Sequence, residues 1–149
     1  MNGKIGSMLA AGVLLLAAFA PRGEVRASAP PPVTHDVRML MDGPVPKFQP
    51  AVLTIHPGDR VRFINVAGGP HNVSFDPATL PAGMDHVLET NMPDQIQRLW
   101  GPLMSEPNAS YTISFEGAKP GRYPYFCVPH MYDRNGGMAN PMKGLIVVR

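Results

Sequence analysis

The chain has 149 residues, of which 44% are hydrophobic and 16% charged, and its formal net charge is +2. This length suits one compact domain and is too short for two substantial ones. A single cysteine, Cys127, excludes an intramolecular disulfide and any zinc or iron–sulfur site that needs four cysteines. Chemistry that uses sulfur must therefore rely on one thiolate, assisted by some of the 5 His and 10 Met.

The first residues have the pattern of an export signal. Lys4 supplies a positive charge, Met8 to Ala20 form an apolar run, and small residues follow. We expect residues 1–27 to be a signal peptide that is cleaved after Ala27, with cleavage after Ala29 as the alternative. An uncleaved membrane anchor is the alternative interpretation, but the apolar run is short for a membrane span. We therefore expect cleavage, and no membrane span after it.

The net charge belongs to this signal. Its removal takes away Lys4, Arg22, Arg26 and Glu24, so that basic residues fall from 13 to 10 and acidic residues from 11 to 10. Nucleic-acid binding needs a basic stripe or patch, and the remaining near-neutral chain offers none in its composition. We therefore expect no nucleic-acid partner.

After a proline-rich lead at residues 28–33, we expect a single domain over residues 34–149. A short helix is predicted at Pro93–Leu99, because Pro93 suits a first helical turn and Asp94 the positive end of the helix dipole. Apolar runs that alternate with turn signals predict strands at Val37–Met41, Ala51–Ile55, Arg60–Val66, His71–Phe75, Tyr111–Phe115, Arg122–Val128 and Gly144–Arg149. This order predicts an all-β protein, an antiparallel β-sandwich with at most one short helix.

The residues that carry chemistry lie at the ends of predicted strands. Cys127 and His130 follow one strand, Met142 precedes the last strand, and His71 begins a strand far upstream. A thiolate, two imidazoles and a thioether are the ligands of mononuclear copper electron-transfer sites, because this set suits both Cu(I) and Cu(II). The two residues between Cys127 and His130 let both side chains reach one metal from a tight loop, which Pro129 stiffens.

Each of these residues also has a simpler interpretation. A lone buried cysteine is often only a small hydrophobic residue, and a lone histidine often lies in a core or on a surface. A Cys-x-x-His pair can also be half of a zinc site, although the other cysteines are absent here. The combination of all four residues in this order favours copper.

At these residues the sequence resembles the small blue-copper proteins of the plastocyanin, pseudoazurin and amicyanin type. The resemblance covers roughly residues 50–149, and it is carried in the correct order by the segments 57–63, 70–76, 120–130 and 142–148. It implies a cupredoxin-like Greek-key β-sandwich that binds one copper ion.

The resemblance also implies a role for each site residue. His71, Cys127 and His130 would be the strong copper ligands, and Met142 the axial ligand. Asn72 would tie the two ligand loops together and donate its backbone N–H toward the cysteine sulfur. An ordinary turn asparagine is the alternative interpretation of Asn72.

The chain departs from the family in one place. Eleven residues, Met131 to Pro141, separate His130 from Met142, whereas relatives have only a few. This insertion contains Met138, which is an alternative axial ligand. We prefer Met142, because it leads directly into the last strand, where the metal is expected. We also expect residues 99–104 to pack under the ligand loops.

The function that these residues imply is that of an exported, periplasmic or otherwise extracytoplasmic, one-electron carrier. Its copper would cycle between Cu(II) and Cu(I), and a redox protein donor and acceptor would dock near His130 on a monomeric chain. The alternative is a periplasmic copper-binding or delivery protein, which the methionine content motivates. An enzyme is not expected: a thiol enzyme needs an exposed, low-pKa cysteine, and multicopper oxidases need His-x-His pairs that this sequence lacks.

Overall fold

The computed structural model describes residue 3, residues 30–131 and residues 141–149. The predicted signal peptide, residues 1–27, lies outside the described residues apart from Gly3, and Met138 also lies outside them. Pro31–Arg149 form one compact unit, which contains every strand and helix described below.

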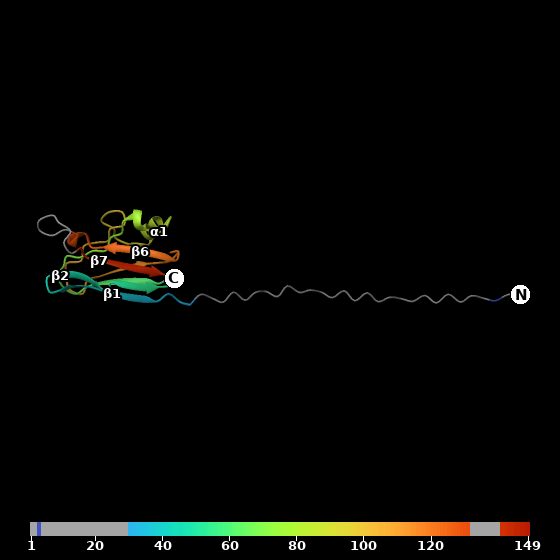
Figure 1. Ribbon diagram of the computed structural model, residues 1–149, viewed down its shortest axis with the longest axis horizontal. Coiled ribbons are helices and arrows are strands. Elements are labelled where there is room, and N and C mark those ends of the chain that lie inside the picture. The colour runs from blue at the N-terminus through green and yellow to red at the C-terminus, as the bar shows by residue number, and fades with distance from the viewer. Residues whose placement is uncertain (1–2, 4–29, 132–140) are drawn as a thin grey trace. The chain divides into compact units, whose positions relative to one another are not determined.

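Two β-sheets face each other in this unit, with β1 and β2 in one layer and β6 and β7 in the other (Figure 1). The first sheet has the strand order β2-β1-β4-β5, formed by Val45–Gln49, Thr34–Asp42, Arg60–Asn65 and Ser110–Ser114. The second has the order β3-β7-β6, formed by Val52–Ile55, Lys143–Val148 and Gly121–Phe126. The predicted all-β Greek-key sandwich is therefore confirmed.

Two strand pairs are parallel, so the expectation of a purely antiparallel sandwich was wrong. β1 pairs in parallel with β4, and β3 pairs in parallel with β7, while the other pairs are antiparallel. The reason is that the chain leaves the first sheet after β2 and forms β3 in the second sheet. This crossover lets it return to β4 in the same direction as β1.

Buried and exposed residues alternate along strand β4, as the sequence pattern predicts. Val61 and Phe63 are fully buried, whereas Arg60 and Arg62 between them are exposed. Apolar side chains on one face of a strand face the core, and polar ones face solvent. The predicted strand at residues 60–66 is thus confirmed within one residue at its end.

Strand β2 is not predicted by the sequence pattern, because it contains Pro46 and Lys47. A proline cannot donate to a sheet hydrogen bond, so a strand with proline is confined to a sheet edge. β2 lies at the edge of the first sheet, where only β1 pairs with it. Edge strands with proline or charged residues have weak sequence patterns for this reason.

The one α-helix among the described residues, α1, spans Met84–Asn91, so the helix predicted at Pro93–Leu99 was wrong. α1 buries Met84 and Leu88, contacts β5, and lies above β6 in Figure 1. Two 3-10 turns, η1 at Pro77–Thr79 and η2 at Val128–His130, complete the elements. Over residues 30–131 and 141–149, no helix is long and apolar enough to cross a membrane.

The side chain of Gln95 explains why the segment after α1 is not helical. Its Nε2 donates to the carbonyls of Glu89 and Met92, at 2.8 and 3.0 Å. Its Oε1 accepts the backbone N–H of Leu99 at 2.6 Å. These bonds replace the main-chain bonds of a helix. The positive φ angles of Asp94 and Leu99, 50° and 62°, interrupt the helical backbone as well.

The core between the sheets is organised around the ring of Tyr125, two residues before Cys127. Its centroid lies 4.7 Å from that of Phe48, 5.3 Å from that of Phe63 and 6.1 Å from that of Phe75. The pairs with Phe48 and Phe63 are edge-on, and aromatic pairs of this kind contribute about 0.5–1.5 kcal/mol each beyond their buried area. Because β6 and the segment of Phe75 both lead to candidate ligands, this packing also positions the site.

Asp59, at the turn before β4, holds the start of β1 in place. Its Oδ1 accepts the backbone N–H of Val33 and its Oδ2 that of His56, each at 2.9 Å. The Nε2 of His35 lies 2.9 Å from Oδ2. Burial alone would raise the pKa of this carboxyl, but these contacts outweigh it and lower the pKa to about 2.

Candidate metal centre

Three side chains with metal-binding atoms meet at one end of the sandwich. The Sγ of Cys127 lies 3.7 Å from the Nδ1 of His71 and 3.4 Å from the Nδ1 of His130. All three ligand atoms lie within 4.8 Å of one another. The structure therefore brings together the three residues that the sequence analysis expects to be the strong ligands.

Secondary structure and main-chain hydrogen bonds hold the backbone at each of these three residues. His71 pairs with Met104 through two main-chain bonds of 3.1 and 2.8 Å, so it forms an isolated bridge rather than the predicted strand. Cys127 follows the last residue of β6, and His130 ends the turn η2. The backbone N–H of His130 donates to the carbonyl of Cys127 at 3.1 Å, and the exposed ring of Pro129 lies within this turn.

The contacts of His71 fix which of its ring nitrogens faces the cysteine. Its Nε2 lies 2.9 Å from the carbonyl oxygen of Ala67. A carbonyl can only accept, so Nε2 carries the proton and Nδ1 presents its lone pair toward Cys127. Burial lowers the pKa of His71 more than the bond to Ala67 raises it, which keeps the ring neutral and able to bind a metal.

The thiol of Cys127 is completely buried. Burial raises its pKa to about 11, although the amide groups of Asn72 and His130 act in the opposite direction. Burial lowers the pKa of His130, and repulsion between the two rings when both are protonated lowers it further. The copper-free centre thus holds a protonated thiol beside two neutral imidazoles, and a metal cation must displace the thiol proton when it binds.

The donor set and its spacing fit a copper ion. With metal–sulfur bonds of about 2.3 Å and metal–nitrogen bonds of about 2.0 Å, as for zinc, sulfur and nitrogen lie about 3.5–3.7 Å apart in tetrahedral or trigonal coordination. The observed separation of 3.7 Å lies in this range, and that of 3.4 Å is just below it. One thiolate with two imidazoles is the strong donor set of blue-copper centres.

Asn72 connects the two ligand segments through both its backbone and its side chain. Its backbone N–H points at the Sγ of Cys127 at 3.4 Å, and its Oδ1 accepts the backbone N–H of Val128 at 2.8 Å. The side-chain Nδ2 donates to the hydroxyl of Ser74 at 3.1 Å and to the carbonyl of Gly101 at 3.4 Å. Asn72 thus contacts both segments, at the position where the sequence resemblance expects a link between them.

Main-chain hydrogen bonds join Met142 to two of the other candidate ligands. Its N–H donates to the carbonyl of His130 at 3.1 Å, and its carbonyl accepts the N–H of Cys127 at 3.0 Å. Its side chain is 1% exposed. The alternative axial residue, Met138, lies outside the described residues.

Residues 99–104 run alongside the first ligand segment, as the sequence analysis expects. The N–H of Phe75 donates to the carbonyl of Leu99 at 3.0 Å, and that of Gly101 to the carbonyl of Val73 at 2.9 Å. The sequence analysis missed Ser74 and Gly101 as supports of Asn72. A serine flanked by Val73 and Phe75 is the only sequence signal for this role.

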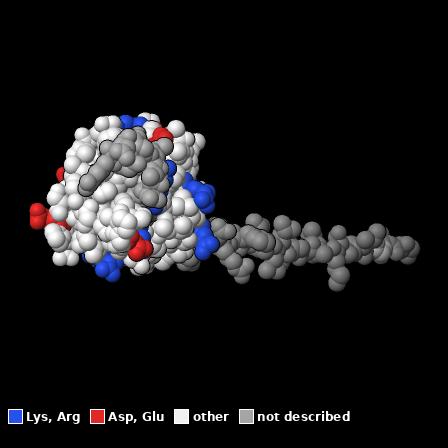
Figure 2. Space-filling view, turned by 60° about the vertical axis from the view of Figure 1, so that its left-hand side comes forward, with Lys and Arg blue, Asp and Glu red and all other residues white. Residues whose placement is uncertain are grey.

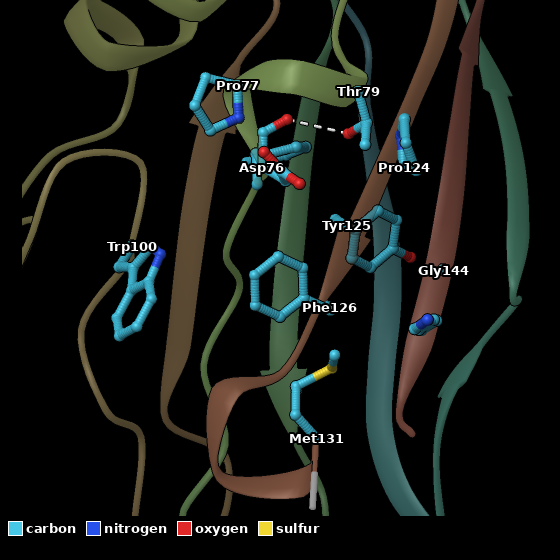
Figure 3. A pocket seen from close by; sticks show the side chains of 11 residues that line it. Asp76, Pro77, Thr79, Trp100, Pro124, Tyr125, Phe126, Met131 and Gly144 are labelled. Carbon is cyan, nitrogen blue, oxygen red and sulfur yellow. Dashed lines mark hydrogen bonds between the residues drawn. The ribbon is translucent and has the colours of Figure 1, made fainter. Parts of the chain in front are cut away.

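A cavity of about 480 Å³ lies beside the end of β6 (Figure 3). Trp100, Phe126 and Met131 line it, and Asp76 and Thr79 lie at its opposite end, joined by a hydrogen bond of 2.9 Å. None of the candidate ligands lines this cavity. It is lined instead by Phe126 and Met131, which neighbour Cys127 and His130 in the sequence.

Comparisons with known proteins agree with this geometry. Residues 36–149 match the family of copper binding proteins described as the plastocyanin/azurin family. The fold and the centre define a β-sandwich protein with one copper site, and the chain belongs to the plastocyanin/azurin family of copper-binding proteins.

Individual relatives lead to the same conclusion. The chain is 35% identical over 131 residues to plastocyanin from Prochlorothrix hollandica, which covers 88% of this chain and 81% of the relative. It is 37% identical over 95 residues to a chloroplastic plastocyanin from Tetradesmus obliquus, which covers 64% of this chain and 58% of the relative. The oxidized form of plastocyanin from Dryopteris crassirhizoma superposes with a TM-score of 0.56 at 29% identity, covering 77% of this chain and 100% of that one.

The match spans about half the length of the chloroplastic relatives. It covers 58%, 45% and 57% of three of them. The relatives are plastocyanins and not enzymes, which agrees with the expectation that this chain is not an enzyme. The expectation of one bound copper is also confirmed by the family and by the cluster of ligand atoms.

Proposed function

We propose that the protein is an exported one-electron carrier with a mononuclear type 1 copper site that connects two larger redox proteins. The observation that carries the proposal is the buried cluster of His71, Cys127 and His130 in a member of the plastocyanin/azurin family. The bound copper supplies the Cu(II)/Cu(I) couple. The protein supplies the ligands and keeps their surroundings fixed.

In this proposal the Nδ1 atoms of His71 and His130 and the Sγ of Cys127 are the strong ligands, and Met142 is the axial ligand. The burial of Met142 and its main-chain bonds to His130 and Cys127 support this choice over Met138. A thioether is a weak ligand, so its main effect is on the reduction potential.

Rapid electron transfer requires ligands that move little when the charge of the metal changes. Main-chain bonds to Met104 hold His71, and paired bonds between Ser74 and Phe126, at 2.9 and 3.0 Å, join the two ligand segments. Asn72 adds a side-chain link between them. These contacts are independent of the metal, so we expect the ligand positions to be nearly the same in both oxidation states.

The route for electrons to and from partners is through His130. His71 and Cys127 are completely buried, whereas the ring of His130 is half-buried. Figure 2 brings forward the end of the sandwich at which β6 ends, and uncharged side chains cover most of the visible face outside the grey atoms. We propose that the redox donor and acceptor both dock near His130, at this end of the sandwich, where few charged groups would oppose close approach.

The proposal includes the export of the chain. Residues 1–27 would be the signal peptide, residues 28–33 a proline-rich lead, and residues 34–149 a monomeric copper-binding domain in the periplasm or another extracytoplasmic space. The start of β1 at Thr34 and the start of the family match at residue 36 support this division.

Copper loading of the purified protein tests this function. One Cu(II) per chain, with intense visible absorption from charge transfer between thiolate and copper, is the expected result. The variant Cys127→Ser is the control: it must lose this absorption, and absorption that survives the substitution contradicts the proposal.

The same titration separates electron transfer from copper delivery. A delivery protein is expected to hold more than one tightly bound Cu(I) per chain. We expect a stoichiometry of one in both oxidation states.

A further inference from the structure

The buried hydroxyl of Ser74 lies next to the centre and acts on it through Asn72. We propose that Ser74 is a positioning residue that raises the reduction potential of the centre by fixing the carboxamide of Asn72. This inference rests on the proposed electron-carrier function, and it concerns a residue that is not a candidate ligand.

The orientation of the Asn72 carboxamide follows from its neighbours. The backbone N–H of Val128 is a donor, so the atom 2.8 Å from it must be Oδ1. Nδ2 therefore faces the opposite way, toward the hydroxyl oxygen of Ser74 and the carbonyl of Gly101. Asn72 and Ser74 are completely buried, so water cannot replace a lost partner without rearrangement.

Ser74 is the better placed of the two acceptors. Its hydroxyl oxygen lies 3.1 Å from Nδ2, compared with 3.4 Å for the carbonyl of Gly101. Its backbone is fixed against the strand that leads to the cysteine, since Ser74 and Phe126 exchange two main-chain bonds of 2.9 and 3.0 Å. The hydroxyl therefore ties the Asn72 side chain to the end of β6.

The carboxamide in turn controls a contact with the sulfur ligand. The backbone N–H of Asn72 points at the Sγ of Cys127 at 3.4 Å. A hydrogen bond to a thiolate reduces the electron density that it donates to the metal, which favours the reduced state and raises the reduction potential. A loose Asn72 side chain weakens both this contact and the link to Val128, so the potential falls.

A matched pair of variants tests the proposal in the full chain. Ser74→Thr and Ser74→Val add similar volume at this buried position, but only threonine keeps a hydroxyl. We expect the copper-loaded Thr variant to keep a potential and visible band near those of the unmodified protein. We expect the Val variant to have a lower potential and a shifted band. In the copper-free protein, hydrogen exchange of the Val128 amide should be about fivefold faster in the Val variant than in the Thr variant, the factor for one net hydrogen bond.

Equal potentials and equal exchange rates in the Thr and Val variants overturn the role of Ser74. Ser74→Ala provides an independent test, measured both with Asn72 present and in an Asn72→Ala background. The potential should shift only where Asn72 is present, and equal shifts in both backgrounds also overturn the proposal. An unmodified protein that shows no intense visible band on copper loading contradicts the electron-carrier function itself, which is a separate outcome.

Discussion

The backbone N–H of Cys127 donates to the carbonyl of Met142 at 3.0 Å, so the candidate sulfur ligand and the residue before the last strand are joined directly. The N–H of Met142 donates in turn to the carbonyl of His130 at 3.1 Å. The long insertion between His130 and Met142 therefore begins and ends at the centre. This arrangement favours Met142 as the axial ligand despite the presence of a second methionine in the insertion.

The axial assignment predicts different results for two methionine substitutions. The weak thioether donor stabilises the oxidised state more than the reduced one. Met142→Leu removes this donor, so the reduction potential should rise. The visible spectrum should shift with it. Met138→Leu should change neither property.

Both variants can be measured by redox titration of the copper-loaded protein. Because leucine keeps the apolar character and approximate volume of methionine, the substitutions isolate the sulfur. A shift caused by Met138→Leu alone assigns the axial position to Met138.

Two buried tyrosines should respond in opposite ways to loss of the hydroxyl group. The hydroxyl of Tyr125 has no hydrogen-bond partner among the described residues, whereas that of Tyr123 donates to the carbonyl of Lys119 at 2.7 Å. Tyr125→Phe should leave the free energy of unfolding unchanged or raise it, because it removes an unsatisfied polar group. Tyr123→Phe should lower it by about 1 kcal/mol.

Denaturant unfolding of the copper-free variants compares the two directly. A larger loss for Tyr125→Phe than for Tyr123→Phe is the result that argues against this account. It would mean that the Tyr125 hydroxyl has a hydrogen-bond partner after all.

The buried carboxyl of Asp59 predicts a loss of stability in acid. Its pKa is lowered from 3.8 to about 2 in the folded protein. A carboxyl with a lowered folded-state pKa stabilises the fold fully above its unfolded pKa, and this contribution is lost as the pH falls toward the folded pKa. About 2 kcal/mol should therefore disappear between roughly pH 4 and pH 2.

Measurements of unfolding against pH in Asp59→Asn test this contribution. The variant should be less stable at neutral pH. Its acid limb, which is the fall in the free energy of unfolding at low pH, should be flatter. Glu106→Gln, which changes an exposed carboxyl, is the matched control and should keep the original limb. An unchanged acid limb in Asp59→Asn assigns the loss to other groups.

The cluster of His71, Cys127 and His130 could be predicted from the sequence because part of the pattern is local. The spacing of Cys127 and His130 at the end of an apolar strand already places both on one turn. Strand β4 was equally predictable, since Val61 and Phe63 alternate with arginines. In these places the residue types and the backbone geometry favour the same structure.

Other features depend on contacts that no local pattern records. The position of α1 was missed because Gln95 makes side-chain bonds that end the helical region before Pro93. The support of Asn72 by Ser74 was also missed. Their side chains meet only because the first ligand segment is pinned between the strand that ends at Phe126 and residues 99–104.

A redox titration of the copper-loaded protein, followed by visible and EPR spectroscopy, tests the central claim most directly. The account predicts one intense thiolate-to-copper band that disappears with one electron and returns on reoxidation, with one copper per chain. An ordinary tetragonal Cu(II) spectrum without this band, or a reduction that cannot be reversed, would contradict it.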